Sequence, residues 1–237
     1  RIGAGTNGVG STLVNIFSKE FKVVTADGSN IFTQVFKNNM GTKGKPVVKP
    51  SNKSFTEISW ITDFSQFDMT EIDDDHYQML EKRVYDLAGT NPSVKIYLNG
   101  KLINLKSFED YVKMYTTSYT IESNKDKSWT VAIGPSDGGF NQVSFVNATE
   151  TYDGGAHVEY ILKQIQEPIR AFIKKKYKVE IKPSEIKQHI SLYINATVNN
   201  PHFSSQTKEK MITEVKDFGY TFDVSDKMIK WIFKNIY

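Results

Sequence analysis

Residues 5–21 read GTNGVGSTLVNIFSKEF and join a glycine-rich loop to an amphipathic segment. The first 12 residues contain four glycines, and apolar residues then recur at helical spacing, at positions 13, 14, 16, 17 and 21. The N–H groups at the start of such a helix have no partner in the helix, and its dipole favours an anion. Glycine at positions 8 and 10 removes the Cβ that would keep a polyphosphate away from the backbone. The stretch therefore predicts a phosphate-binding loop at a helix start.

Two alternatives to this interpretation stay open at the level of the residues. Residues 3–8 match the dinucleotide fingerprint G-x-G-x-x-G, and Asp27 ends the next predicted strand at the expected distance. That fingerprint must follow a buried strand, however, and only Arg1 and Ile2 precede it here. The other alternative is an ordinary mobile loop, because glycine clusters commonly punctuate loops.

Composition narrows the class of protein. The 237 residues include no cysteine, which excludes disulfide scaffolds, thiolate metal sites and cysteine nucleophiles and fits a reducing compartment. No apolar run approaches 18 residues, so we expect no membrane span and an intracellular protein that is not secreted. The chain begins with Arg1 rather than methionine, and we expect it to be a piece of a longer protein.

Charge is unevenly distributed along the chain. The net charge of +3 is too small to predict nucleic-acid binding, but residues 63–86 carry −6 and residues 163–187 carry +5. The basic segment includes Lys174, Lys175 and Lys176 at the end of a predicted helix, where cations also offset the helix dipole. The acidic segment includes residues 73–76, Asp-Asp-Asp-His, for which compensation of the dipole at a helix start is a better account than a metal site.

Hydrophobic periodicity and turn residues predict the following elements. Strands are expected at 21–26, 30–36, 55–61, 94–98, 101–105, 128–134, 141–149 and 190–198, and helices at 68–87, 107–115, 157–178 and after Ser225. Asn99-Gly100 is expected to form a hairpin turn, Pro168 to kink the long helix, and residues 37–54 to form an exposed loop. The character of the chain changes near residue 118, where we place a domain boundary.

Five stretches of the sequence resemble one family in order and approximate spacing. They are GTNGVGSTLVNIFSKEF, EKRVYDLAG (81–89), VKIYLNGKLINLKSFEDYVKMY (94–115), NQVSFVNATETYDGGAHVEYI (141–161) and NPHFSSQTKEKM (200–211). The first resembles the ATP lid of the GHKL ATPases, and together they resemble the type IIA DNA topoisomerases of the eukaryotic and T-even phage type. The resemblance covers essentially the whole chain.

The resemblance implies an α+β fold: the C-terminal part of a GHKL (Bergerat) ATPase α/β sandwich over residues 1–118, with its ATP lid at 3–12. A transducer domain of the ribosomal-protein-S5-domain-2-like type, with a mixed sheet and a long helix, would follow over residues 119–237. The family's phosphate-cradling residues fall on Gly5, Thr6, Asn7, Gly8, Val9, Gly10, Ser11 and Thr12, and its transducer loop on Gln206, Thr207 and Lys208. Lys208 is implied to reach the γ-phosphate as the catalytic lysine, and Lys174, Lys175 and Lys176 to contact DNA.

The same resemblance implies partners and cofactors. They are ATP with Mg²⁺, double-stranded DNA, a second copy of the enzyme joined through the ATPase region, the missing N-terminal ATPase half and the DNA-cleavage core. The family's general-base glutamate and magnesium ligand would lie upstream of residue 1 and its DNA-cleaving tyrosine far downstream, so we expect this chain alone to be inactive. Thr6, Val9 and Thr12 depart from residues common in eukaryotic members, which puts side-chain contacts to phosphate in doubt while leaving the backbone cradle.

Overall fold

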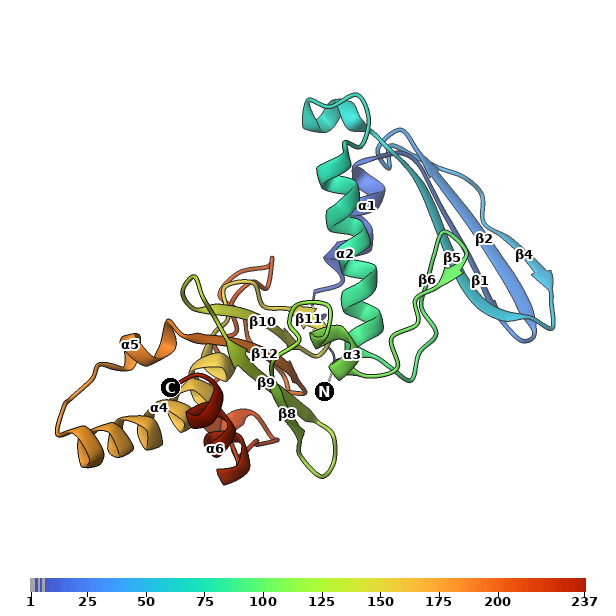
Figure 1. Cartoon of the computed structure of the whole chain (residues 1–237). Coiled ribbons are helices and arrows are strands. Elements are labelled where there is room, and N and C mark those ends of the chain that lie inside the picture. The colour runs from blue at the N-terminus through green and yellow to red at the C-terminus, as the bar shows by residue number, and fades with distance from the viewer. Residues whose placement is uncertain (1–2, 4, 6) are drawn as a thin grey trace. The chain divides into compact units, whose positions relative to one another are not determined.

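The computed structural model describes residues 3, 5 and 7–237. The chain divides into two compact units, residues 5–78 and a second that includes residues 79–237. This division falls within a helix, whereas the boundary predicted near residue 118 separates two domains of the family and stays a prediction. Figure 1 shows the elements of each unit.

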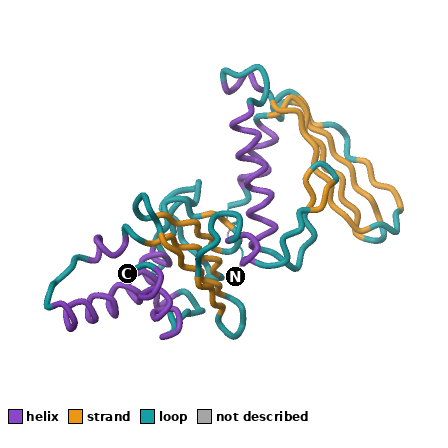
Figure 2. Tube along the Cα trace, viewed as in Figure 1, coloured by secondary structure: helices purple, strands orange, loops and turns teal. Residues whose placement is uncertain are grey.

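The first unit is an antiparallel sheet preceded by a short helix. Helix α1 (Val9–Ile16) leads into β1 (Ser18–Asp27) and β2 (Asn30–Lys37), which are followed by β3 (Thr42–Lys43), β4 (Val47–Pro50), β5 (Ser54–Thr62) and the 3-10 turn η1 (Phe64–Phe67). The sheet order is β3-β2-β1-β5, and β4 also pairs with β2. Figure 2 shows these strands as one orange layer. The hairpin between β1 and β2 turns at Gly28, whose φ of 91° suits glycine.

Two predictions for this unit were wrong in part. The stretch 37–54 is not a simple loop, because it contains β3 and β4. All four residues of β4 are exposed, so its strand conformation comes from backbone pairing with β2 and leaves no apolar alternation in the sequence. Helix α1 begins at Val9, within the stretch predicted as loop, because the glycines at its start hide the helical pattern.

The second unit is a mixed sheet with helices on both faces. Its strands are β8 (Thr120–Ser123), β9 (Trp129–Pro135), β10 (Asn141–Val146), β11 (Thr149–Glu150) and β12 (Ile190–Ala196), in the order β11-β10-β12-β9-β8. Only β10 and β12 run parallel among these pairs. The helices are α2 (Asp74–Thr90), which begins before residue 79, α3 (Phe108–Val112), α4 (Ala156–Tyr177), α5 (Pro183–Lys187) and α6 (Asp226–Asn235), with the hairpin β6 (Tyr97–Leu98) and β7 (Lys101–Leu102) and the 3-10 turn η2 (Val215–Asp217). The predicted mixed sheet with a long helix is confirmed.

The core lies on both faces of the mixed sheet. The long helix predicted from hydrophobic periodicity is confirmed, and Ile161, Ile165 and Ile169 on one side of α4 are fully buried in one cluster with β9, β12 and α6. A second cluster on the other face joins α3 to β10 and β12 through Phe108, Tyr111 and their neighbours. Helix α4 continues through Pro168, and the kink stays a prediction.

Capping and turn residues explain where several elements begin. The Ser225 hydroxyl accepts from the N–H of Met228 at 3.1 Å and caps α6 as predicted. Asn99 and Gly100 have φ of 49° and 76°, as a two-residue hairpin turn requires. Helix α2 begins at Asp74 rather than at the predicted Asp68, because the Asp73 carboxylate accepts from the N–H of His76 at 2.9 Å.

Candidate functional site

The predicted phosphate-binding loop ends at the start of α1. Gly8 precedes the first helical residue with φ of 65°, and no side chain caps the helix. The first N–H groups of a helix have no partner within it, so those of residues 9–11 point to where an anion is favoured. Six predicted ATP-binding residues, Asn7, Gly8, Val9, Gly10, Ser11 and Thr12, are thus brought together at one helix start, while Thr6 lies outside the described residues.

The space around these glycines is open. Among the residues that the structure describes, a Cβ built on Gly5, Gly8 or Gly10 would meet no atom within 4 Å. For Gly8 the left-handed φ accounts for glycine, but Gly10 is helical and has no positive φ. Glycine within a helix costs up to about 1 kcal/mol relative to alanine. Packing against the described residues therefore gives no reason for glycine at position 10, which agrees with the predicted clearance for a ligand.

The predicted transducer loop is a compact turn in the second unit. The N–H of Lys208 donates to the Ser205 carbonyl at 3.2 Å, and the hydroxyls of Ser205 and Thr207 lie 2.6 Å apart. Lys208 itself has φ of 63° and is half-buried. Gln206 and Thr207 are exposed beside it, so the turn presents three polar side chains at its tip. The glycine loop at α1 belongs to the first unit and this turn to the second.

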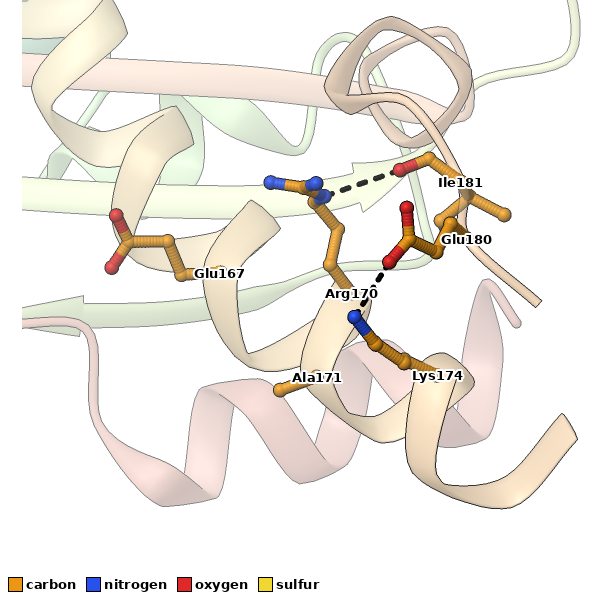
Figure 3. Close-up of a pocket in the computed structure, with 6 residues that line it drawn as sticks. All are labelled: Glu167, Arg170, Ala171, Lys174, Glu180 and Ile181. Atoms are coloured by element: carbon orange, nitrogen blue, oxygen red, sulfur yellow. Dashed lines mark hydrogen bonds and ion pairs between the residues drawn. The ribbon is translucent and has the colours of Figure 1, made fainter. Parts of the chain in front are cut away.

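The basic end of α4 borders a small pocket (Figure 3). The pocket has a volume of about 230 Å³ and is lined by Glu167, Arg170, Ala171, Lys174, Glu180 and Ile181. Lys174 Nζ lies 2.5 Å from Glu180 Oε1, and this contact holds the pKa of the Glu180 carboxyl below its usual value. Arg170 Nε donates to the carbonyl of Ile181 at 3.1 Å, as the second dashed line in Figure 3 shows. One of the three predicted DNA-contacting lysines is therefore paired with a carboxylate.

The other two lysines differ from Lys174. Lys176 Nζ lies 5.4 Å from the ring centroid of Phe172 and 4.9 Å from that of Tyr177. Lys175 is exposed and has no ion pair with any residue that the structure describes. It is the most available of the three for a phosphate.

The structure also places polar groups that the sequence did not single out. Lys82 on α2 contacts Asp86 at 3.1 Å and Glu150 at 2.8 Å, and the buried Asp86 accepts from the Tyr111 hydroxyl at 2.6 Å. These contacts fasten α2 to α3 and β11. His157 is buried at the start of α4, and burial lowers its pKa from 6.5 to about 3. Only their contacts across the fold reveal these groups, because neither shows a motif spacing.

The dinucleotide alternative is overturned. The strands that follow the glycine loop form an antiparallel sheet, whereas the fingerprint belongs to a parallel one. Asp27, which would bind a ribose, accepts from the N–H groups of Ser29 and Asn30 at 2.8 Å each within its own turn. These two hydrogen bonds, of which the one from Asn30 has the larger effect, lower the pKa of the Asp27 carboxyl.

The described residues also contain no cluster of three metal-ligating side chains and no helix long and apolar enough to cross a membrane.

The helix and antiparallel sheet of the first unit and the mixed sheet of the second match solved ATPase regions of type II topoisomerases. The structure of the ATPase region of Saccharomyces cerevisiae topoisomerase II matches with a TM-score of 0.93 and 36% identity, covering 99% of this chain and 63% of that one. The ATPase and transducer domains of DNA topoisomerase II from Balamuthia mandrillaris match with a TM-score of 0.92 and 35% identity, covering 98% and 62%.

Sequence comparison gives the family. The family described as DNA gyrase B matches residues 95–236. DNA topoisomerase 2 of Arabidopsis thaliana is 40% identical over 98% of this chain, and human DNA topoisomerase 2-alpha is 38% identical over 97%. The chain belongs to the DNA gyrase B family, among the type II DNA topoisomerases. It spans 17% and 16% of the length of these two relatives. The predicted family and fold class are confirmed.

Proposed function

We propose that this chain is the lid and transducer part of an ATP-dependent type II DNA topoisomerase, which passes one DNA duplex through a transient break in another. The observation that carries the proposal is the start of α1, where Gly8 supplies no capping side chain and the glycines leave open space beside the first N–H groups, which have no partner within the helix. ATP would be held there and would close a gate between two copies of the enzyme.

Two elements of the chain would contact the triphosphate. The backbone of Gly5–Thr12 would cradle the phosphates, with Thr6 included on family resemblance alone. Gln206, Thr207 and Lys208 would reach the γ-phosphate from the second unit, a task that suits lysine as a flexible point charge. Mg²⁺ would accompany ATP and would be held by a residue outside this chain.

The sheet of the first unit supports the proposal that further protein covers it. Ile58 and Trp60 of β5 point to one face of the sheet and are 46% and 52% exposed. A pocket of about 250 Å³ is lined by Leu13, Val14, Phe17, Ser18, Trp60, Thr62 and Phe67. Exposed apolar groups on this scale mark interaction surfaces. Because the chain covers 63% of the yeast ATPase region, we assign this surface to the remaining ATPase half.

The transported duplex would meet the basic end of α4. Lys174, Lys175 and Lys176 lie together in the last turn of that helix. Neutralising phosphates requires only basic side chains at the right place and supplies affinity without sequence preference. The DNA-cleavage core would be a further partner, and the enzyme would act inside the cell.

Replacing Lys208 with alanine in the assembled enzyme tests the proposal. A hydrogen bond to a charged group is worth about 1.5–3 kcal/mol, so nucleotide-driven dimer closure should require about ten- to hundredfold more ATP. Lys210→Ala is the matched control, because Lys210 is exposed in the same loop outside the predicted triplet. Closure at the parent ATP concentration in Lys208→Ala would contradict the assignment.

A further inference from the structure

Two segments of the second unit, far apart in sequence, are joined through their backbones beside the transducer loop. Residues 153–155 form a turn that leads into α4 at Ala156, and residues 209–211 follow Lys208. The N–H of Asp153 donates to the Glu209 carbonyl at 2.8 Å, the N–H of Met211 to the Gly154 carbonyl at 3.0 Å, and the N–H of Ala156 to the Met211 carbonyl at 3.0 Å. Three hydrogen bonds therefore hold the returning side of the loop against the start of α4.

Gly155 permits this close approach. A Cβ at position 155 would lie 2.1 Å from the Met211 carbonyl oxygen and 2.7 Å from its nitrogen, distances that no real side chain tolerates. Its φ of 130° is also in a region that L side chains rarely adopt. A Cβ on the adjacent Gly154 would meet nothing nearer than Val158 Cγ2, at 3.3 Å. Only Gly155 therefore controls the distance between the turn and the loop.

Backbone contacts at the base of the loop connect Met211 to the tip, so we expect a shift at Met211 to displace the tip. Met211 is fully buried in the core and pairs with Phe203 across the loop. The N–H of Ser204 donates to the Lys210 carbonyl at 3.0 Å, one step closer to the tip. Lys208 is three residues from Met211 and is held in the left-handed region within the tight turn. The backbone between them has little freedom to absorb a displacement.

We propose that Gly155 is a positioning residue for Lys208. By letting the Met211 backbone seat against the start of α4, it fixes where the loop presents the ammonium group to the terminal phosphate of a nucleoside triphosphate. Gly155 touches no ligand in this arrangement. The inference rests on the role proposed for Lys208 and adds to it the part of the fold that sets the position of that lysine.

Two variants disturb the contact between the Met211 backbone and the start of α4, called the seat of the loop below, in different ways. Gly155→Ala forces the segments apart, and Ala156→Pro removes the donor to the Met211 carbonyl at the first helical position, where proline is tolerated. Gly154→Ala is the matched control, because Gly154 has φ of 66° in the same turn, but a Cβ there would meet side-chain atoms of Val158 and Gln142 rather than the Met211 backbone. Amide hydrogen exchange over residues 204–211 should be faster in both seat variants than in Gly154→Ala.

The functional readout is nucleotide-driven dimer closure in the assembled enzyme. Each seat variant should require about tenfold more ATP, as expected when one charged hydrogen bond is removed, and should add no further defect in combination with Lys208→Ala. If Gly155→Ala fails to fold, Ala156→Pro decides. Normal closure in the folded seat variants, or defects that add to that of Lys208→Ala, would overturn this inference alone. Normal closure in Lys208→Ala itself would overturn it together with the proposed function.

Discussion

Gly10→Ala should stabilise α1 and weaken triphosphate binding, two effects of opposite sign. A Cβ at position 10 meets no atom of the described residues within 4 Å, so alanine introduces no clash with them. It removes the helical cost of glycine and should raise the free energy of unfolding by at most about 1 kcal/mol. A phosphate oxygen bonded to a backbone N–H lies about 2.9 Å from the nitrogen, so we expect a methyl group on the adjacent Cα to hinder the approach of a polyphosphate. Removing one such bond costs about 1.5–3 kcal/mol, or about ten- to hundredfold in affinity.

Titration calorimetry on the complete ATPase region, with a non-hydrolysable ATP analogue, measures this decrease in affinity. Adenosine should bind the variant and the parent equally, because it lacks the phosphates. Gly138→Ala is the matched control: Gly138 also has open space around it but lies in the loop between β9 and β10. Parent affinity for the triphosphate in a folded, stabilised Gly10→Ala protein would refute the idea that this glycine makes room for a ligand.

Two further predictions concern charge. Changing Lys174, Lys175 and Lys176 to glutamine should lower the DNA-stimulated ATPase activity and leave hydrolysis without DNA unchanged. The salt slope of DNA binding should fall by about 0.9 for each phosphate that is no longer neutralised. An unaltered salt titration would show that these lysines serve only to offset the helix dipole. Because burial lowers the pKa of His157 to about 3, the unfolded chain binds a proton below pH 6.5 that the folded chain does not. Stability should therefore fall by about 1.4 kcal/mol per pH unit below 6.5, in urea unfolding, and the decrease should shrink in His157→Gln but persist in the exposed His189→Gln. An equal decrease in His157→Gln would assign it to other groups.

Local signals predicted the elements whose cause is local. The stripe of α4, the cap at Ser225 and the hairpin turn at Asn99 each depend on residues within a few positions of one another. The family resemblance supplied the rest of the fold class, because the order of the strands in the mixed sheet leaves no local pattern. The pairing of β10 with β12 spans the whole of α4 and has no signature in either strand alone.

The burial of the strands and their long-range contacts could not be predicted from this sequence. In β5 eight of the nine residues are exposed. The alternation of its residues correctly indicated a strand, but it did not indicate that neither face of the strand is buried among the described residues. The Asp86 network is likewise invisible in sequence, since its partner Tyr111 lies 25 residues away. For the site, sequence could nominate residues 7–12 and 206–208, but not the hydrogen bonds that hold the latter loop against the start of α4.

Two glycines that look equivalent in the sequence have different surroundings in the structure. Gly10 and Gly155 both belong to motifs of the resemblance, yet a Cβ on one meets nothing and a Cβ on the other meets backbone at 2.1 Å. Empty space beside a helical glycine has no use within the fold and is explained by something that approaches from outside. Filled space beside a glycine is explained by the segment that fills it, here Met211. The same change to alanine should therefore stabilise the chain at position 10 and destabilise it at position 155, while impairing the response to nucleotide at both.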